Sequence, residues 1–182
     1  MNFLELTLWT DEHTQEIIDL FTKTFTDSEG KTEGELIGNL AHDLMTKADK
    51  DTLRVFIVQE KDVIVGCIFF SEMTFQKSSQ KAYLLAPVAI LTQYQGKGIG
   101  QKLIHFAHNI LKKEGKDIVI TYGDIRFYEK VGYSPISEEI IQAPLKLSYP
   151  QGWLAQSLLQ NNISPIPGKS HCIEAFNDPR YW

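Results

Sequence analysis

The first fifty residues change from strand periodicity to helix periodicity. Phe3–Trp9 alternates apolar with polar or small residues, which predicts a strand. Thr10 then stands where an N-cap belongs, and apolar residues recur at helical spacing after it, at Ile17, Leu20, Phe21 and Phe25. A second helix is predicted to begin near Thr32, which has the form of a capping box with Glu35. Its apolar face consists of Leu36, Leu40, Leu44 and Ala48.

From Leu53 onward the pattern is typical of strands. Leu53–Gln59 and Val63–Phe75 are β-branched runs on either side of a short polar turn, which predicts a hairpin. Gln80–Leu91 is long and nearly all apolar, as expected for a strand that is covered on both faces. The helical period then returns in a segment that ends before Gly115, with apolar residues at Ile99, Leu103, Phe106, Ala107, Ile110 and Leu111.

The C-terminal part has shorter elements. Asp117–Tyr122 is predicted as a strand, Ile125–Val131 as a helix and Gly132–Pro135 as a further strand or turn. The tail is rich in loops, with short strands expected at Leu145–Tyr149 and Cys172–Phe176. This order of elements predicts an α/β (α+β) fold with a single mixed sheet, partly parallel and partly antiparallel, flanked by helices. It also predicts one domain over residues 1–182, with a core at about 1–140 and an extension at about 141–182 packed on it.

Composition excludes several classes of protein. The chain has 182 residues, of which 43% are hydrophobic and 23% charged, a balance typical of a globular protein. Its two cysteines are far apart, which argues against a disulfide framework or a zinc site. No apolar run reaches the length of a membrane span, and no secretory signal is visible. We therefore expect a cytoplasmic protein without a metal and without a membrane partner.

The net charge of −5 is unevenly distributed. The first fifty residues hold eleven acids and four lysines, whereas the remainder holds twelve acids and fourteen bases. This asymmetry weakly favours a cationic substrate on the acidic side, although acids that merely solvate two helices give the same pattern. Basic patches with interleaved aromatic residues are missing from the sequence, so a nucleic-acid partner is not expected.

The strand that ends at Leu91 runs into a glycine-rich turn, Gln95–Gly100, that opens a helix. The first amides of a helix have no internal acceptor, and glycines allow an anion to approach them closely. The turn is therefore either a phosphate-binding device or a tight turn that needs positive φ. Its spacing matches neither the Rossmann fingerprint nor the P-loop, which argues against a nucleotide-binding protein.

Two motifs resemble those of the GNAT superfamily of N-acetyltransferases. Gln95–Gly100, with the sequence QGKGIG, matches every fixed position of the family's acetyl-CoA motif Q/R-x-x-G-x-G/A. Phe127–Tyr133, with the sequence FYEKVGY, is similar to the family's F-Y-E-K-x-G-F segment and lies downstream, where the family has it. Gly123-Asp124 and the tail segment Ser148–Trp153 resemble the YhbS-type branch. The resemblance covers roughly Leu53 to Pro135.

This resemblance implies specific roles. Backbone groups of Val88, Ala89 and Ile90 would bind the pantetheine arm of acetyl-CoA, the cosubstrate. The pyrophosphate would be cradled by the backbone amides of Gln95, Gly96, Lys97, Gly98, Ile99 and Gly100. Tyr128 would be the general acid that protonates the departing CoA thiolate, because a phenol stays protonated at neutral pH. Glu72 is the candidate general base, with Asp124 and Tyr122 as rivals.

The implied function is transfer of an acetyl group from acetyl-CoA to a primary amine of a small, cationic acceptor. The alternative is a non-catalytic module that binds acyl-CoA. The family often has Asn and Ala where this chain has Thr121 and Asp124, so the acceptor does not follow from the resemblance. His105 and His108 lie one helical turn apart but lack a third ligand, so packing or surface roles are expected rather than a metal site. Aromatic residues of the tail suit either a homodimer interface or packing within the chain.

Overall fold

A computed structural model of the chain describes residues 4–159 and 162–182. Phe3, with which the first predicted strand starts, lies outside these residues. The described residues group into two compact units. The first contains the chain up to Phe69 together with Pro87–Ala107, and the second contains Phe70–Ala86 together with His108–Trp182. The C-terminal residues are thus grouped with Phe70–Ala86 in the second unit.

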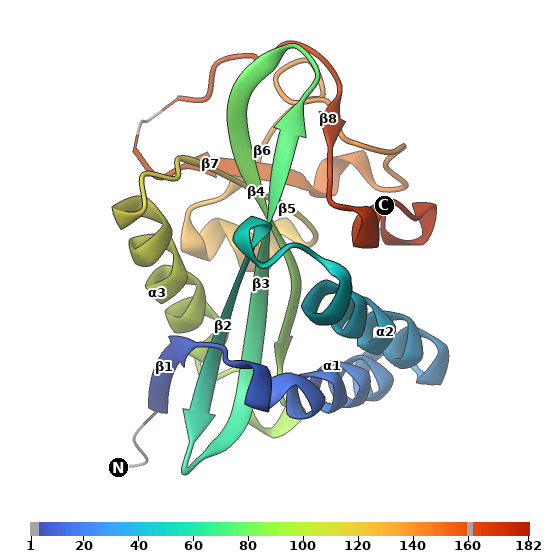
Figure 1. Cartoon of the computed structure of the whole chain (residues 1–182), viewed down its shortest axis with the longest axis vertical. Helices are drawn as coiled ribbons and strands as arrows, with labels where there is room; N and C mark the ends of the chain where they lie inside the picture. Colours follow the sequence, from blue (N-terminus) through green and yellow to red (C-terminus); the bar gives the residue numbers. More distant parts are fainter. Residues whose placement is uncertain (1–3, 160–161) are drawn as a thin grey trace. The chain divides into compact units, whose positions relative to one another are not determined.

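The sheet combines parallel and antiparallel pairing, which confirms the predicted α/β fold class (Figure 1). The order of its strands is β1-β2-β3-β4-β5-β7-β6, and β8 pairs with β3. The strands are β1 (Leu4–Leu8), β2 (Leu53–Glu60), β3 (Val63–Phe75), β4 (Ser78–Ile90), β5 (Ile118–Tyr122), β6 (Ser134–Pro135), β7 (Trp153–Ser157) and β8 (Ser170–His171). The α-helices are α1 (Thr14–Glu29), α2 (Lys31–Lys47), α3 (Ile99–Lys113) and α4 (Ile125–Tyr128).

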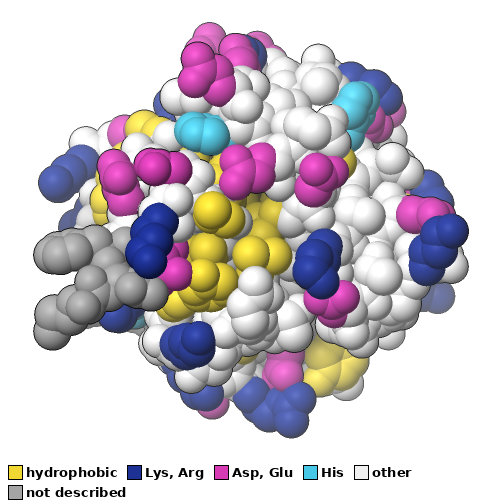
Figure 2. All heavy atoms as spheres, turned by 90° about the horizontal axis from the view of Figure 1, so that it is seen from below, with side chains coloured by type: hydrophobic (Ala, Val, Ile, Leu, Met, Phe, Trp, Pro, Cys, Tyr) yellow, Lys and Arg dark blue, Asp and Glu magenta, His cyan; other side chains and the backbone are white. Residues whose placement is uncertain are grey.

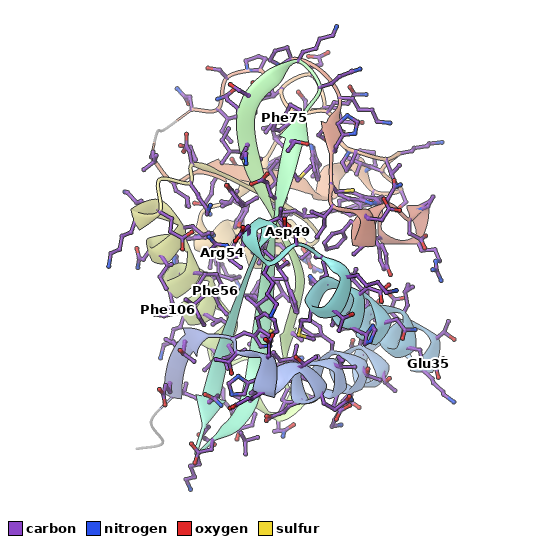
Figure 3. The ribbon with its side chains drawn as sticks, viewed as in Figure 1. Glu35, Asp49, Arg54, Phe56, Phe75 and Phe106 are labelled. Carbon is purple, nitrogen blue, oxygen red and sulfur yellow. The ribbon has the colours of Figure 1, made fainter. Side chains whose placement is uncertain are left out.

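In the first unit, α1 and α2 lie side by side and bury most of the apolar faces that periodicity predicted (Figure 1). Phe25 and Leu36 are only half-buried, and Ala48 lies just after the end of α2. Ile17 and Phe21 of α1 and Leu40 and Leu44 of α2 are all buried. On the strand side, Phe56 of β2 and Phe106 of α3 point toward each other, with ring centroids 6.1 Å apart and the rings nearly perpendicular (Figure 3). Apolar burial of this kind is the main source of folding free energy.

In the second unit, β5 lies between β4, to which it is parallel, and β7, to which it is antiparallel. Aromatic residues of the tail pack within this unit. Trp153, Phe176 and Trp182 are all buried, and the Trp182 indole N–H donates to the carbonyl of Phe176 at 2.9 Å. Of the two roles considered for these aromatics, their burial supports packing within the chain.

Three local predictions were wrong. The second helix begins at Lys31, with Gly30 as its N-cap, so Thr32 lies inside the helix and does not cap it. Leu145–Tyr149 forms no strand, because its amides are used elsewhere: that of Ser148 donates to the Trp182 carbonyl and that of Tyr149 to the Tyr122 hydroxyl. Near Cys172–Phe176, the strand is instead Ser170–His171, and Glu174–Phe176 is a 3-10 turn.

None of the helices in the described part of the chain is both long enough and apolar enough to cross a membrane.

Close packing of α1 against α2 gives a test with a matched control. A Cβ added at Gly34 would lie 2.6 Å from the Thr22 carbonyl oxygen and 2.9 Å from the Thr26 amide nitrogen, so backbone would have to move. A Cβ added at Gly38 would meet chiefly the Thr22 hydroxyl, which can rotate away. We expect Gly34→Ala to lower the free energy of unfolding by about 1–3 kcal/mol. Gly38→Ala should lose less, because alanine favours a helix by up to about 1 kcal/mol over glycine. Urea denaturation measures both, and equal losses would contradict this account.

Candidate active site

The glycine-rich turn has the backbone conformation that its sequence requires. A 3-10 turn, Thr92–Tyr94, follows β4, and α3 begins at Ile99. Between them, Gly96 and Gly98 adopt φ angles of +72° and +74°, a region that other residues rarely enter. A Cβ at either position would meet no atom within 4 Å. The glycines are therefore needed for conformation rather than for packing, and the turn leads directly into the N-terminus of α3, where an anion binds favourably.

Two carboxylates hold the residues that precede this turn. The Tyr94 hydroxyl donates to Glu60 Oε2 at 2.6 Å, and the Thr92 hydroxyl donates to Asp27 Oδ2 at 2.8 Å. The hydrogen bond to Glu60 raises the pKa of Tyr94. Hydrogen bonds from Lys23 and then Thr92 lower the pKa of Asp27. The turn is thereby tied to the end of β2 and to α1, two elements that lie far from it in sequence.

Two of the predicted cofactor residues use their side chains to shape the turn. Gln95 Nε2 donates to the Ile90 carbonyl at 2.8 Å, which joins the turn to the last residue of β4, and the Gln95 amide donates to the Thr92 carbonyl. Lys97 Nζ donates to the Gln93 carbonyl at 2.8 Å and lies 5.2 Å from the centre of the Tyr94 ring. Both residues thus stabilise the turn. The last two residues of the motif, Ile99 and Gly100, already belong to α3.

Val88, Ala89 and Ile90 lie at the end of β4, beyond the segment that pairs with β5. The parallel register joins Ala82–Leu85 to Ile118–Thr121, and β4 then continues to Ile90. The Leu91 amide donates to the Val65 carbonyl on β3 at 2.9 Å. A strand end of this kind offers backbone donors and acceptors to an extended ligand.

Tyr128 lies in the second unit, at the end of the short helix that follows β5. Asp124 caps this helix, and the Asp124 carbonyl accepts from the Tyr128 amide at 3.2 Å. The Tyr128 ring packs so closely on Gly123 that a Cβ there would lie 2.8 Å from Cε2. The residue is half-buried, and burial raises the pKa of its phenol.

A buried histidine–tyrosine pair behind Tyr128 was not predicted. His108 Nε2 and the Tyr133 hydroxyl are 3.1 Å apart, and both residues are buried. The Tyr133 ring meets that of Tyr128 edge to face at 5.7 Å, and burial raises the pKa of Tyr133 well above its usual value. The available signal was Tyr133 itself, which stands where the family motif has Phe. His108 thus packs in the interior, and in the described part of the chain no group of three His, Cys, Asp or Glu side chains is placed to hold a metal.

Glu72 and Tyr128 lie at opposite ends of β5. Glu72 forms an ion pair with Lys81 at 2.9 Å, and Lys81 directly precedes Ala82, which pairs with the first residue of β5. Tyr128, in contrast, follows the last residue of that strand. Hydrogen bonding to Glu72 raises the pKa of Lys81. The role of Glu72 stays a prediction, and this placement counts against it.

The two rival bases lie on the side of β5 where Tyr128 lies, but both are already hydrogen-bonded. Asp124 accepts from the Arg126 amide at 2.9 Å and from its guanidinium at 2.6 Å, and Arg126 holds the pKa of the carboxyl below its usual range. The Tyr122 hydroxyl accepts from the Tyr149 amide at 2.6 Å and lies 3.1 Å from Ser148 Oγ.

Acidic and basic side chains are intermixed on the face shown in Figure 2, where they surround a small hydrophobic area. Part of the acidic surplus in α1 and α2 is neutralised locally. Lys23 pairs with Asp27 at 2.8 Å and Lys47 with Asp43 at 2.8 Å, each one helical turn apart. At least Asp27 and Asp43 therefore belong to a solvated helix surface, as the second of the two interpretations expects.

Comparison with known proteins agrees with the motifs and the fold. Residues 51–135 match the family model described as acetyltransferase (GNAT) domain. The Escherichia coli (strain K12) protein named uncharacterized N-acetyltransferase YjhQ is 28% identical over 115 residues, which are 60% of this chain and 63% of that protein. This chain thus covers less than two thirds of that relative.

Two solved structures share the fold. The YhbS GNAT-family N-acetyltransferase from E. coli, in complex with CoA, superimposes with a TM-score of 0.84 at 18% identity, covering 98% of this chain and 94% of that one. A GNAT acetyltransferase from Brucella melitensis, in complex with acetyl-CoA, gives 0.72 at 21% identity, covering 97% and 100%. The fold and the matched segment define a GNAT domain. Over residues 51–135 the chain matches a GNAT acetyltransferase domain, and in fold and sequence it resembles the YhbS type of that family.

Proposed function

We propose that the chain is an acetyl-CoA-dependent N-acetyltransferase that acts in the cytoplasm on a primary amine of a small, cationic acceptor. The observation that carries the proposal is the open turn Gln95–Gly100, with Gly96 and Gly98 at positive φ in front of α3. The names of the relatives and the CoA ligands of the two solved structures support the same cosubstrate.

The residues present fit a ligand that is extended at one end and carries phosphates at the other. Backbone groups of Val88–Ile90 bind the pantetheine arm in this proposal. The amides from Gly96 to Gly100 face the pyrophosphate, since the start of a helix attracts negative charge. The Gln95 amide is already used by Thr92, so Gln95 contributes by tying the turn to Ile90. Acetyl-CoA supplies the acetyl group as a reactive thioester.

Tyr128 serves as the general acid. Its phenol keeps its proton at neutral pH, because burial raises its pKa. When the acceptor nitrogen displaces CoA from the acetyl group, the Tyr128 O–H bond breaks and an S–H bond forms on the departing thiolate. The acceptor must lose one proton as its nitrogen forms the new amide bond. Glu72 is the proposed base for that proton, with Tyr122 and Asp124 as rivals.

Thermal stabilisation by ligands tests whether the glycine turn binds CoA or a nucleotide such as ATP or NAD. Acetyl-CoA or CoA at 100 times its dissociation constant should stabilise the protein by about 2.7 kcal/mol, or roughly 5–10 °C. ATP and NAD should not. Gly98→Ala should abolish most of this shift, whereas Gly115→Ala is the matched control. Gly115 also has positive φ (+75°) and open space around its Cα, but it follows the C-terminus of α3. A shift with ATP or NAD alone would overturn the assignment.

Replacement of Tyr128, the proposed general acid, tests whether the protein is an enzyme or a module that only binds acyl-CoA. Tyr128→Phe should lower kcat about 100-fold or more, the usual contribution of a positioned acid, and should leave the thermal shift with CoA unchanged. Release of CoA on addition of a panel of small amines measures kcat. Binding of acetyl-CoA by the wild type without any amine-dependent release would instead support the non-catalytic module.

Replacement of the candidate base tests the weakest part of the scheme. If Glu72 accepts the acceptor proton, Glu72→Gln should lower turnover at least about tenfold. Lys81→Met is the control, because it breaks the same ion pair but keeps the carboxylate. An unchanged rate in Glu72→Gln would remove Glu72 from the mechanism and direct attention to Tyr122 and Asp124.

A further inference from the structure

Tyr133 contacts Tyr128 twice, through its backbone and through its ring. The Tyr133 amide donates to the Tyr128 carbonyl at 3.2 Å, and the two rings meet edge to face, with centroids 5.7 Å apart and planes at 72°. Gly132, at φ +96°, makes the turn between these contacts, and the next residue, Ser134, pairs with Ala155 on β7. Tyr133 therefore joins the helix that carries Tyr128 to the sheet.

The Tyr133 hydroxyl has a buried partner on α3. It lies 3.1 Å from His108 Nε2, and the two residues are only 2% and 7% exposed. Burial raises the pKa of Tyr133 well above its usual value, so its phenol stays neutral and can both donate and accept. The hydrogen bond therefore forms with either tautomer of the His108 ring.

Ring contacts hold His108 in turn. Its ring meets that of Phe70 on β3 edge to face at 5.9 Å and that of Tyr133 at 5.6 Å. A continuous series of ring contacts thus runs from Phe70 through His108 and Tyr133 to Tyr128. The hydrogen bond is the polar contact within this series, and it fixes the direction of the Tyr133 ring against which Tyr128 packs.

We propose that His108 and Tyr133 are positioning residues for Tyr128: their hydrogen bond fixes the Tyr133 ring, and this ring, with the Tyr133 amide, sets the direction of the Tyr128 phenol. The proposal rests on the proposed function, in which Tyr128 is the general acid. The family's motif has Phe where this chain has Tyr133, and Phe has no hydroxyl for His108. The hydrogen-bonded pair is therefore not part of the motif.

The position of an acid matters because proton transfer needs a short, aligned contact with the leaving group. A misplacement of about 1 Å can lower a rate about 100-fold. A pair that only satisfied two buried polar groups would contribute to the stability of the fold, but its loss would not depend on the presence of the Tyr128 hydroxyl. This dependence is what distinguishes the two roles.

Three substitutions separate the hydrogen bond from the packing. Tyr133→Phe removes the hydroxyl and keeps the ring. His108→Met keeps a side chain of similar length without a hydrogen-bonding nitrogen, whereas the matched control His108→Gln places an amide close to the position of Nε2. We expect Tyr133→Phe and His108→Met to lower kcat about tenfold through misplacement of the acid. His108→Gln should restore most of it. KM for acetyl-CoA should stay unchanged in all three, since the glycine turn is not altered.

A double-mutant cycle with Tyr128→Phe tests whether the effect passes through Tyr128. In the Tyr128→Phe background, Tyr133→Phe and His108→Met should leave kcat unchanged, because the group that they position is gone. Equal fold losses of kcat in the two backgrounds would overturn the proposal, and so would an equal loss in His108→Gln and His108→Met. Tyr133→Phe, the smaller change, carries the cycle if His108→Met does not fold.

Ring geometry gives a readout that needs no turnover. In protein with ¹³C-labelled tyrosine and phenylalanine rings, signals of residues 128 and 133 are assigned by their changes in Tyr128→Phe and Tyr133→Phe. The nuclear Overhauser effect between these two rings should be weaker in His108→Met than in the wild type and His108→Gln. An unchanged effect in His108→Met would contradict the proposal. Failure of the proposed function has another signature: the wild type releases no CoA with any amine, or Tyr128→Phe keeps full kcat.

Discussion

The end of the β4–β5 pairing is the constraint on which the candidate chemistry depends. Up to Leu85 and Thr121 the two parallel strands use their backbone groups on each other. Beyond that rung β4 continues to Ile90, and the chain after β5 turns at Gly123 into the helix that carries Tyr128. One buried hydroxyl, that of Thr121, donates to the last paired carbonyl of β4, and Asp124 caps the helix that follows. The location of the acid is therefore set by the sheet itself rather than by a flexible loop.

The glycine turn needs a different kind of support, because glycines lose more conformational entropy on folding than other residues. The residues that lead into the turn are held by two carboxylates: Asp27 accepts from Thr92, and Glu60 accepts from Tyr94. The first residue of the turn, Gln95, is held to β4 by its own side chain. None of these contacts touches the open space in front of Gly96 and Gly98. The hydrogen bonds that order the turn therefore leave the space beside both glycines free. A turn that is ordered before binding lowers the entropy cost of binding an anion.

Periodicity and motifs predicted most of this framework, because they depend on neighbours in sequence. The apolar repeat located α1, α2 and α3, the β-branched runs located β2, β3 and β4, and spacing identified the glycine turn. The partners of Thr92, Tyr94 and Thr121 could not be predicted, because each is a contact between segments far apart in sequence. The predicted strand at Leu145–Tyr149 was wrong for a related reason. The amides of Ser148 and Tyr149 donate to Trp182 and Tyr122, so this segment does not form the hydrogen-bond ladder of a sheet.

The proton on the acceptor is the remaining constraint on the proposed reaction. Of the two carboxylates considered, Glu72 is paired with Lys81 at the far end of β5, and Asp124 is held by Arg126. Arg126 lowers the pKa of Asp124, so Asp124 is poorly suited to deprotonate an ammonium group, and the place of Glu72 at the other end of β5 from Tyr128 leaves that residue a weak candidate. An alkylammonium acceptor, with a pKa near 10 like that of lysine, would then reach the site largely protonated and react through its small neutral fraction. The acid limb of the rate profile would follow the acceptor's ionisation, and the alkaline limb would follow Tyr128, whose raised pKa preserves the acid at the pH where the neutral amine becomes abundant.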